Sequence, residues 1–188
     1  MKIVLASESQ SRRRALDILG LPYEVSASAL EEKAIRDSDP AALTKKLAEA
    51  KAWKVADRLQ DAVVVSGDAV VAKDEKIFEK PRSNDEAKDF LRQLSGSAFQ
   101  FVTSLAVIHS DTRKMLSTVE ISEIRFRSLV EHEIQDYISR YPVLRFAGAF
   151  EGDGVLRLAD SVSGSYNFIT ALPVSRLAVF LREQGVEV

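Results

Sequence analysis

The sequence contains no cysteine and only two histidines among its 188 residues. The absence of cysteine excludes a disulfide framework, a thiolate zinc site and a cysteine nucleophile, and it fits a reducing cytoplasm. Because His109 and His132 are the only imidazoles, a histidine-rich metal site and a Ser-His-Asp triad are both disfavoured. A metal site built from oxygen ligands remains possible.

The chain also lacks an excess of charge of one sign and a long apolar run. Its 26 Lys and Arg nearly balance its 28 Asp and Glu, which predicts no general attraction to nucleic acid or to an anionic membrane. The apolar run at residues 3–6 is too short for a signal-peptide core, and no stretch of about 18 apolar residues occurs. We expect a cytoplasmic protein with no membrane or nucleic-acid partner, in which any anion site is local.

The chain is 46% hydrophobic and has only eight glycines and five prolines, a composition typical of a globular protein. From its length we expect a single domain over residues 1–188. The predicted strands are residues 3–5, 23–26, 62–72, 76–78, 99–108, 116–127 and 154–161. The predicted helices are one around residues 15–19 and four at 41–59, 84–94, 131–140 and 174–181. We expect Ser66, Gly67 and Asp68 to interrupt the third strand. Interleaved strands and helices predict an α/β or α+β fold around one mixed sheet.

The first candidate for chemistry is the segment 7–14, Ser-Glu-Ser-Gln-Ser-Arg-Arg-Arg, between a strand and a helix. Backbone N–H groups at a helix N-terminus, serine hydroxyls and guanidinium groups all bind anions. Three arginines beside the positive end of a helix dipole need an anion or must point away. From spacing alone, an ordinary basic surface helix fits equally well.

The second candidate is Asp68, a carboxylate inside an apolar strand, where an unpartnered charge is costly. A hydrogen-bond network, a basic partner or a divalent metal would each compensate it. Lys80 follows twelve residues later, Glu32 follows the second strand, and Lys51 lies beside the apolar stripe of its helix. Each residue taken singly fits a structural charge, but together they could hold a polyphosphate with a divalent cation and activate a water.

The third candidate is the glycine-spaced acidic segment 148–154, Gly-Ala-Phe-Glu-Gly-Asp-Gly, which also fits a turn that enters a strand. It is neither a P-loop nor a GxGxxG fingerprint, and the chain has no HExxH motif or EF-hand loop.

Taken in order, these segments resemble the Maf proteins, nucleoside triphosphate pyrophosphatases of the inosine-triphosphatase-like class, over essentially the whole chain. The motifs that carry the resemblance are Leu5 to Ser9 with Arg12 and Arg13, Glu32, Leu47-Ala48 with Lys51, Gly67-Asp68, Glu79-Lys80-Pro81, Leu94-Ser95-Gly96, Ala147 to Phe150 and Leu172-Pro173. Two positions depart from the family pattern. Gln10-Ser11 replaces its Ser-Pro, and Ala171 replaces the glycine of its Gly-Leu-Pro.

The resemblance implies a two-lobed fold with a central mixed sheet, flanking helices and a deep cleft. It also implies cleavage between the α- and β-phosphates of a nucleoside triphosphate, with Mg2+ or Mn2+ as cofactor. The residues expected to hold substrate phosphates are Ser7, Ser9, Arg12, Arg13, Lys51 and Lys80. Glu32 and Asp68 are the expected acidic pair that places the metal, with Asp68 as the general base for the attacking water.

Asp153 is the residue from which we predict the base. In the Maf branch that acts on dTTP and UTP a glutamine stands there, whereas a carboxylate only accepts hydrogen bonds and suits the two donors of a guanine edge. The sequence therefore favours 7-methyl-GTP or another modified purine triphosphate, and dTTP or UTP is the alternative. The family's aromatic stacking residue at position 11 is Ser11 here, so this partner is either missing or replaced by Phe150 or Trp53. A nucleotide-binding regulator of septum formation without useful hydrolysis is a further alternative, and the resemblance makes a homodimer plausible.

Overall fold

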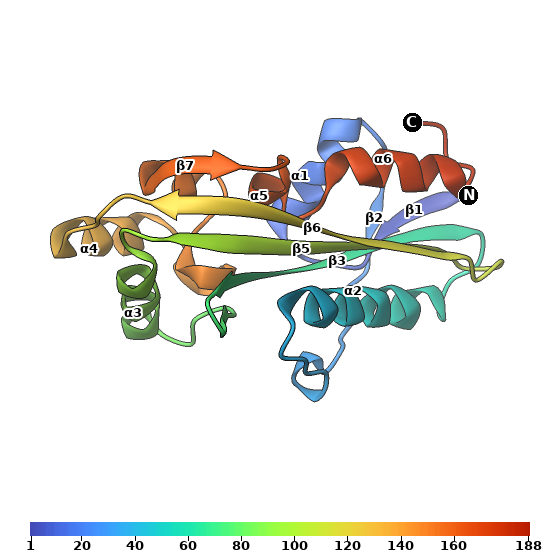
Figure 1. The fold of residues 1–188 in the computed structure, drawn as a ribbon. Helices are drawn as coiled ribbons and strands as arrows, with labels where there is room; N and C mark the ends of the chain where they lie inside the picture. The colour runs from blue at the N-terminus through green and yellow to red at the C-terminus, as the bar shows by residue number, and fades with distance from the viewer. The chain divides into compact units, whose positions relative to one another are not determined.

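The computed structural model describes residues 1–188, which form seven strands in one sheet with helices beside it (Figure 1). The strands are β1 (Lys2–Leu5), β2 (Glu24–Val25), β3 (Ala62–Lys73), β4 (Lys76–Phe78), β5 (Ala98–His109), β6 (Met115–Phe126) and β7 (Ala159–Ser163). The α-helices are α1 (Gln10–Leu19), α2 (Pro40–Ala56), α3 (Asn84–Leu94), α4 (Glu131–Arg140), α5 (Asn167–Thr170) and α6 (Val174–Glu183). Four 3-10 turns complete the chain, η1 (Glu32–Ala34), η2 (Val143–Arg145), η3 (Ala147–Ala149) and η4 (Gly154–Arg157).

The sheet is mixed, with strand order β2-β1-β3-β5-β6-β7 and with β4 paired to β3. Strand β1 pairs in parallel with β2 and with β3. Strand β4 pairs antiparallel with β3, and β7 pairs antiparallel with β6. This arrangement confirms the predicted α/β class with one mixed sheet.

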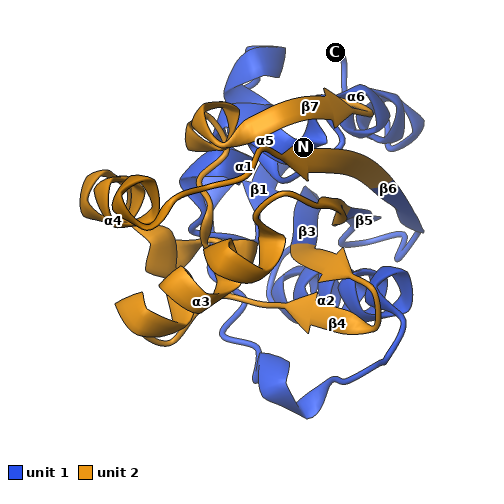
Figure 2. Cartoon of the chain, turned by 60° about the vertical axis from the view of Figure 1, so that its left-hand side comes forward, with its two compact units in different colours: residues 1–68, 103–120, 166–188 blue, residues 69–102, 121–165 orange.

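The chain divides into two compact units, which Figure 2 distinguishes by colour. Unit 1 comprises residues 1–68, 103–120 and 166–188, and unit 2 comprises residues 69–102 and 121–165. The long strands β3, β5 and β6 each have residues in both units. Two units agree with the predicted two lobes, whereas the deep cleft stays a prediction.

In unit 1 the sheet is buried on both faces. One face packs against α2 through a cluster that includes Val4, Ala48, Ala52 and Val64. The other face packs against α1 and α6 through a cluster that includes Leu5, Leu16, Val65 and Leu177. Figure 1 shows α2 and α6 on opposite sides of the strands. Because both faces are covered, the central strand β3 is an almost continuous run of buried residues, as the valine-rich sequence predicts.

In unit 2 the helix α3 packs against α4, η2 and η3. Phe150 has its ring centroid 5.7 Å from that of Phe99 and 5.6 Å from that of Phe126, and these two rings meet edge to face at 4.8 Å. Aromatic rings in such arrangements bury large areas, so this cluster forms a core of the unit.

The structure departs from the predicted elements at three places. Strand β3 runs without a break through Ser66, Gly67 and Asp68, which were expected to interrupt it. The predicted strand 154–161 is instead the turn η4 followed by β7, because the Glu151 carboxylate accepts a hydrogen bond from Gly154 N and draws the chain into a local turn. The short elements η1 and α5 were not predicted. No helix combines the length and the apolar character that crossing a bilayer requires.

Candidate active site

The centre of the candidate site in unit 1 is the ammonium group of Lys51, which lies between two carboxylates. Its Nζ atom is 2.6 Å from Asp68 Oδ1 and 3.1 Å from Glu32 Oε1. The side chains of Lys51 and Asp68 are only 6% and 10% exposed, whereas that of Glu32 is 51% exposed. The structure therefore brings together three residues that lie far apart in the sequence, with Asp68 as the inner and Glu32 as the outer carboxylate.

Local sequence features place these three side chains. Helix α2 begins where the Asp39 side chain accepts a hydrogen bond from Ala41 N, with Pro40 in the first turn, and it carries Lys51 toward the sheet. Side chains alternate between the two faces of a strand, so Asp68 lies on the same face of β3 as Val64, four residues earlier. That side faces α2, which explains why Lys51 and Asp68 meet. Glu32 opens the turn η1.

A buried hydrogen-bond chain fixes the backbone at Asp68. Ser104 on β5 is fully buried, and its Oγ atom accepts a hydrogen bond of 3.2 Å from Asp68 N. The same hydroxyl donates to Thr44 O on α2 at 2.7 Å. Thr44 is also fully buried, and its own hydroxyl donates to Pro40 O at 3.0 Å. Ser104 thus connects the strand that carries Asp68 to the helix that carries Lys51.

Arg12 from the first turn of α1 points into unit 1. Its Nη1 donates to Ser7 Oγ at 3.2 Å, and its Nε donates to Ala171 O at 3.4 Å. Desolvation lowers the pKa of the Arg12 guanidinium, and the negative charges of Asp68 and Glu32 oppose this shift. An arginine remains charged in either case. The group is therefore a second cation close to the acidic pair.

The other residues of the predicted anion segment lie around Arg12. The Ser7 hydroxyl accepts a hydrogen bond from Ser9 N at 3.2 Å, and Ser9 precedes the first residue of α1. Arg13 and Arg14 are exposed, and Arg14 reaches the Tyr166 hydroxyl. Of the three arginines, Arg12 is thus the one that turns toward the acidic pair.

The segment that holds Arg12 from the other side has an unusual backbone. Ala171 ends helix α5 with φ +50°, a left-handed conformation in which glycine is favoured. The buried hydroxyl of Thr170 donates to Leu172 O at 2.7 Å and supports this turn. Leu172 in turn lies so close to β3 that a Cβ atom on Gly67 would be 2.3 Å from its Cδ2. The same Cβ atom would be 2.6 Å from the backbone oxygen of Ser104, which cannot move aside as a leucine side chain can, so glycine is required next to Asp68.

The remaining predicted site residues, Lys80, Asp153 and Phe150, belong to unit 2. Lys80 is exposed beyond the end of β4, and Asp153 is exposed just before η4. Phe150 is only 3% exposed, since the aromatic core of unit 2 encloses its ring. The expectation that Phe150 stacks on a base therefore finds no support in the structure. The other expected stacking residue, Trp53, lies against the guanidinium of Arg113, 4.2 Å from the ring centroid.

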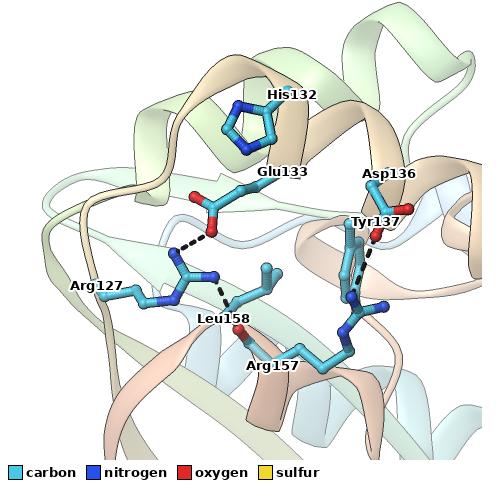
Figure 3. Close-up of a pocket in the computed structure, with 7 residues that line it drawn as sticks. All are labelled: Arg127, His132, Glu133, Asp136, Tyr137, Arg157 and Leu158. Carbon is cyan, nitrogen blue, oxygen red and sulfur yellow. Dashed lines mark hydrogen bonds and ion pairs between the residues drawn. The ribbon is translucent and has the colours of Figure 1, made fainter.

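A polar pocket of about 240 Å3 is found elsewhere in unit 2 (Figure 3). Its two guanidiniums are already paired, Arg127 with Glu133 at 2.7 Å and Arg157 with Asp136 at 3.1 Å. Ligand pockets for small molecules usually measure about 300 to 1,000 Å3. Because this pocket is smaller and its charges are satisfied, it is not the candidate nucleotide site.

The donor set of the candidate site fits a hard divalent cation only in part. Carboxylate oxygens are the ligands that Mg2+ and Mn2+ prefer, and Glu32 and Asp68 both have an oxygen within 3.1 Å of one point, the Lys51 nitrogen. No group of three or more His, Asp and Glu side chains that could hold a metal ion occurs in the structure. Two carboxylates supply too few ligands for a metal ion on their own, but they are sufficient where substrate phosphates supply further oxygen ligands.

Comparison with known proteins shows the fold and the family of this chain. A solved structure of a HAM1 protein from Coxiella burnetii matches 97% of this chain and 99% of its own, with a TM-score of 0.53 and 16% sequence identity, which shows a shared fold. The family model described as Maf-like protein matches residues 2–184. The chain belongs to the Maf family.

Several proteins of known name resemble the whole chain. One from Desulforamulus reducens is 34% identical over 99% of this chain and 98% of its own, and one from Pelotomaculum thermopropionicum is 35% identical over 100% and 98%. One from Bacillus cereus is 34% identical over 100% and 97%. All three are named dTTP/UTP pyrophosphatase. These findings confirm the predicted family and enzyme class, a nucleotide pyrophosphatase, but their names match the alternative substrates rather than 7-methyl-GTP.

Sequence reasoning missed three contributors to the site: Ser104, Thr44 and the carbonyl group of Ala171. A signal for Ser104 was present, because Thr103 and Ser104 are polar residues within an otherwise apolar strand. The roles of Thr44 and Ala171 had no local signal, since each depends on a partner far away in the chain.

Proposed function

We propose that this protein hydrolyses the bond between the α- and β-phosphates of dTTP and UTP, giving a nucleoside monophosphate and pyrophosphate. The observation that carries the proposal is the cluster of Lys51, Asp68 and Glu32, with Arg12 close to it. Cations for phosphate binding and carboxylates for water activation are the groups that such a hydrolysis needs. The choice of dTTP and UTP follows the names of the relatives.

Unit 1 supplies groups that suit the binding of phosphate. Arg12 presents a guanidinium, which pairs with phosphate oxygens in a bidentate manner, and Ser7 presents a hydroxyl beside it. Helix α1 begins at Gln10, so its free N–H groups add partial positive charge at the same place. We assign Ser7, Ser9, Arg12, Arg13 and Lys51 to the phosphates, and the phosphate-binding role of Lys80 stays a prediction from the family resemblance.

Asp68 is the proposed general base. Its carboxylate is almost fully buried and is held by Lys51 on one side, and its backbone is held by Ser104. A carboxylate fixed in this way can accept a proton from a water that attacks the α-phosphorus. Glu32 and Asp68 would hold Mg2+ or Mn2+, which would neutralise charge on the phosphate oxygens as the leaving pyrophosphate departs.

A second candidate substrate, 7-methyl-GTP, is favoured by Asp153. This carboxylate is exposed on unit 2, and it can accept hydrogen bonds from both donors of a guanine edge. Uracil and thymine offer a single N–H donor between two carbonyl groups, which a carboxylate matches less well. The two candidates undergo the same reaction, and what Asp153 would distinguish is the base.

Pyrophosphate release tests both parts of the proposal. The substrates are dTTP, UTP, CTP, GTP and 7-methyl-GTP at equal concentration, each with Mg2+ and with Mn2+. We expect the highest kcat/KM for dTTP and UTP. A clear preference for 7-methyl-GTP would replace the proposed base, and no release from any substrate would overturn the enzymatic function.

Replacement of Asp153 identifies the residue that reads the base. If Asp153 contacts the base, Asp153→Gln changes the ratio of kcat/KM between UTP and 7-methyl-GTP by about tenfold or more. The matched control is Asp160→Asn, because Asp160 is an exposed aspartate of the same unit. An unchanged ratio in Asp153→Gln would remove Asp153 from base recognition.

A further inference from the structure

The Lys51 ammonium occupies the position between Glu32 and Asp68 that a metal cation would need. Both carboxylate oxygens lie within 3.1 Å of the same nitrogen, and the inner contact to Asp68 is 2.6 Å. A divalent cation bound by the same two oxygens would therefore compete with this nitrogen for them. The monovalent Lys51 ammonium thus neutralises the two carboxylates that would otherwise bind the divalent metal ion.

We infer that Lys51 is an internal counter-ion of the acidic pair, and that the pair accepts a divalent cation only when nucleotide phosphates draw Lys51 away. Metal and nucleotide then bind together, and the metal does not bind first. The inference rests on the proposed function, because it needs a polyphosphate as the anion that attracts Lys51.

The balance of charge supports this order of binding. The two carboxylates are matched by two cations, Lys51 and the nearby Arg12. A metal ion that entered without an anion would meet the Lys51 ammonium at short range in a partly desolvated site, where repulsion is weakly screened, and the charge of Arg12 would add to this repulsion. A nucleoside triphosphate brings about four negative charges and reverses this balance.

The number of ligands leads to the same conclusion. Mg2+ takes six oxygen ligands, and two carboxylates supply a minority of them. No group of three or more metal-binding side chains is present to complete the shell. The phosphate oxygens of the substrate can complete it, and the flexible four-carbon stem of Lys51 allows its ammonium to follow them.

Binding of Mn2+, measured by electron paramagnetic resonance, tests the inference on the full-length protein. The variants are Lys51→Met and Lys51→Gln, which remove the internal cation, and Lys51→Met/Asp68→Asn, which also removes the inner carboxylate charge. Lys45→Met is the matched control, because Lys45 is an exposed lysine of the same helix. Each protein is titrated without nucleotide, and the wild type also with α,β-imido-UTP, which the enzyme cannot cleave at that bond.

We expect Lys51→Met and Lys51→Gln to bind Mn2+ at least tenfold more tightly than the wild type without nucleotide, and the double variant to lose this gain. In wild type, α,β-imido-UTP should raise the Mn2+ affinity at least tenfold. Unchanged affinity in both Lys51 variants would overturn the inference, and so would a wild type that binds Mn2+ equally well with and without the analogue while releasing pyrophosphate from UTP.

These measurements separate the inference from the proposed function. Failure of the proposed function is defined by wild-type protein that releases no pyrophosphate from any substrate. The comparison of Lys51→Met with wild type needs no substrate, so it judges the counter-ion role in that case as well.

Discussion

Lys51 and Asp68 form a nearly buried ion pair, with Lys51 Nζ 2.6 Å from Asp68 Oδ1 and side chains only 6% and 10% exposed. A buried pair of this kind gains little net stability, because the loss of hydration offsets the attraction between the charges. Surface pairs, by contrast, cost little to make and contribute about as little. The pair therefore contributes little to the stability of the fold, and the role that we propose for it is chemical, in the hydrolysis described above.

Asp68→Asn tests the general base. Asparagine keeps the shape of the side chain but cannot accept the proton from water, so we expect turnover of UTP to fall by about a hundredfold or more while the protein stays folded. Pyrophosphate release gives the rate, and binding of α,β-imido-UTP by calorimetry reports the retained site. Asp57→Asn is the control, because Asp57 is an exposed aspartate that pairs with Arg113 on the surface of the same unit. Normal turnover in Asp68→Asn would exclude the assignment.

Ser104 and Ser66 are two fully buried serines for which we predict different effects of substitution by alanine on stability. Ser104 donates to Thr44 O and accepts from Asp68 N, so Ser104→Ala removes two buried hydrogen bonds and should lower the free energy of unfolding by about 1 to 3 kcal/mol. The Ser66 hydroxyl is buried with no hydrogen-bond partner, so Ser66→Ala should be neutral or stabilising.

Urea unfolding measures both serine variants against the wild type. Ser66 lies on β3 and Ser104 on the adjacent strand β5, and each substitution removes one buried hydroxyl oxygen. The change in packing is therefore the same kind in both variants, and only the loss of hydrogen bonds differs. Equal effects of Ser104→Ala and Ser66→Ala would show that the hydrogen bonds of Ser104 contribute nothing beyond packing.

Much of unit 1 could be predicted from local sequence. Asp39-Pro40 marks the start of α2, Gly20 ends α1 with φ +66°, and the valines of β3 give a strand buried on both faces. Each of these features acts within one turn or one strand, so the pattern of neighbouring residues is sufficient.

The parts that sequence did not predict depend on long-range contacts. Ser104 bonds to residues 36 and 60 positions away, and no spacing rule connects such partners. Gly67 looked like a break in β3, but the strand continues there and the missing side chain makes room for Leu172. Phe150 was a predicted replacement for a missing stacking residue, yet the aromatic core of unit 2 encloses it.

Ala171→Gly should stabilise the protein. Ala171 has φ +50°, and the left-handed conformation costs a residue with a Cβ atom about 1 kcal/mol, which glycine avoids. We expect a rise of about 0.5 to 1 kcal/mol in the free energy of unfolding, measured by urea unfolding. Gly20→Ala is the reverse control, because Gly20 has φ +66° and its Cβ would meet no atom within 4 Å. It should lose a similar amount, and a loss on Ala171→Gly would contradict the argument.

Glu133 should make unit 2 sensitive to acid. Its carboxylate pairs with Arg127 at 2.7 Å and accepts a hydrogen bond from Val130 N, and these contacts lower its pKa from the ordinary 4.5 to about 2. A carboxyl group whose pKa is lower in the folded than in the unfolded protein stabilises the fold at pH values above its unfolded pKa. This stabilisation is lost as pH falls from about 4.5 toward 2. Glu133→Gln should therefore lower Tm at pH 7 and flatten the dependence of Tm on pH in that range.

Thermal unfolding between pH 7 and pH 2 provides the comparison for Glu133. Glu123→Gln is the matched variant, because Glu123 is an exposed glutamate on β6 of the same unit. Its curve should run parallel to that of the wild type, since its replacement leaves the Arg127 to Glu133 pair in place. If the Tm of Glu133→Gln instead falls as much as that of the wild type between pH 4.5 and pH 2, protonation of Glu133 does not destabilise the fold. The acid sensitivity would then come from other carboxylates.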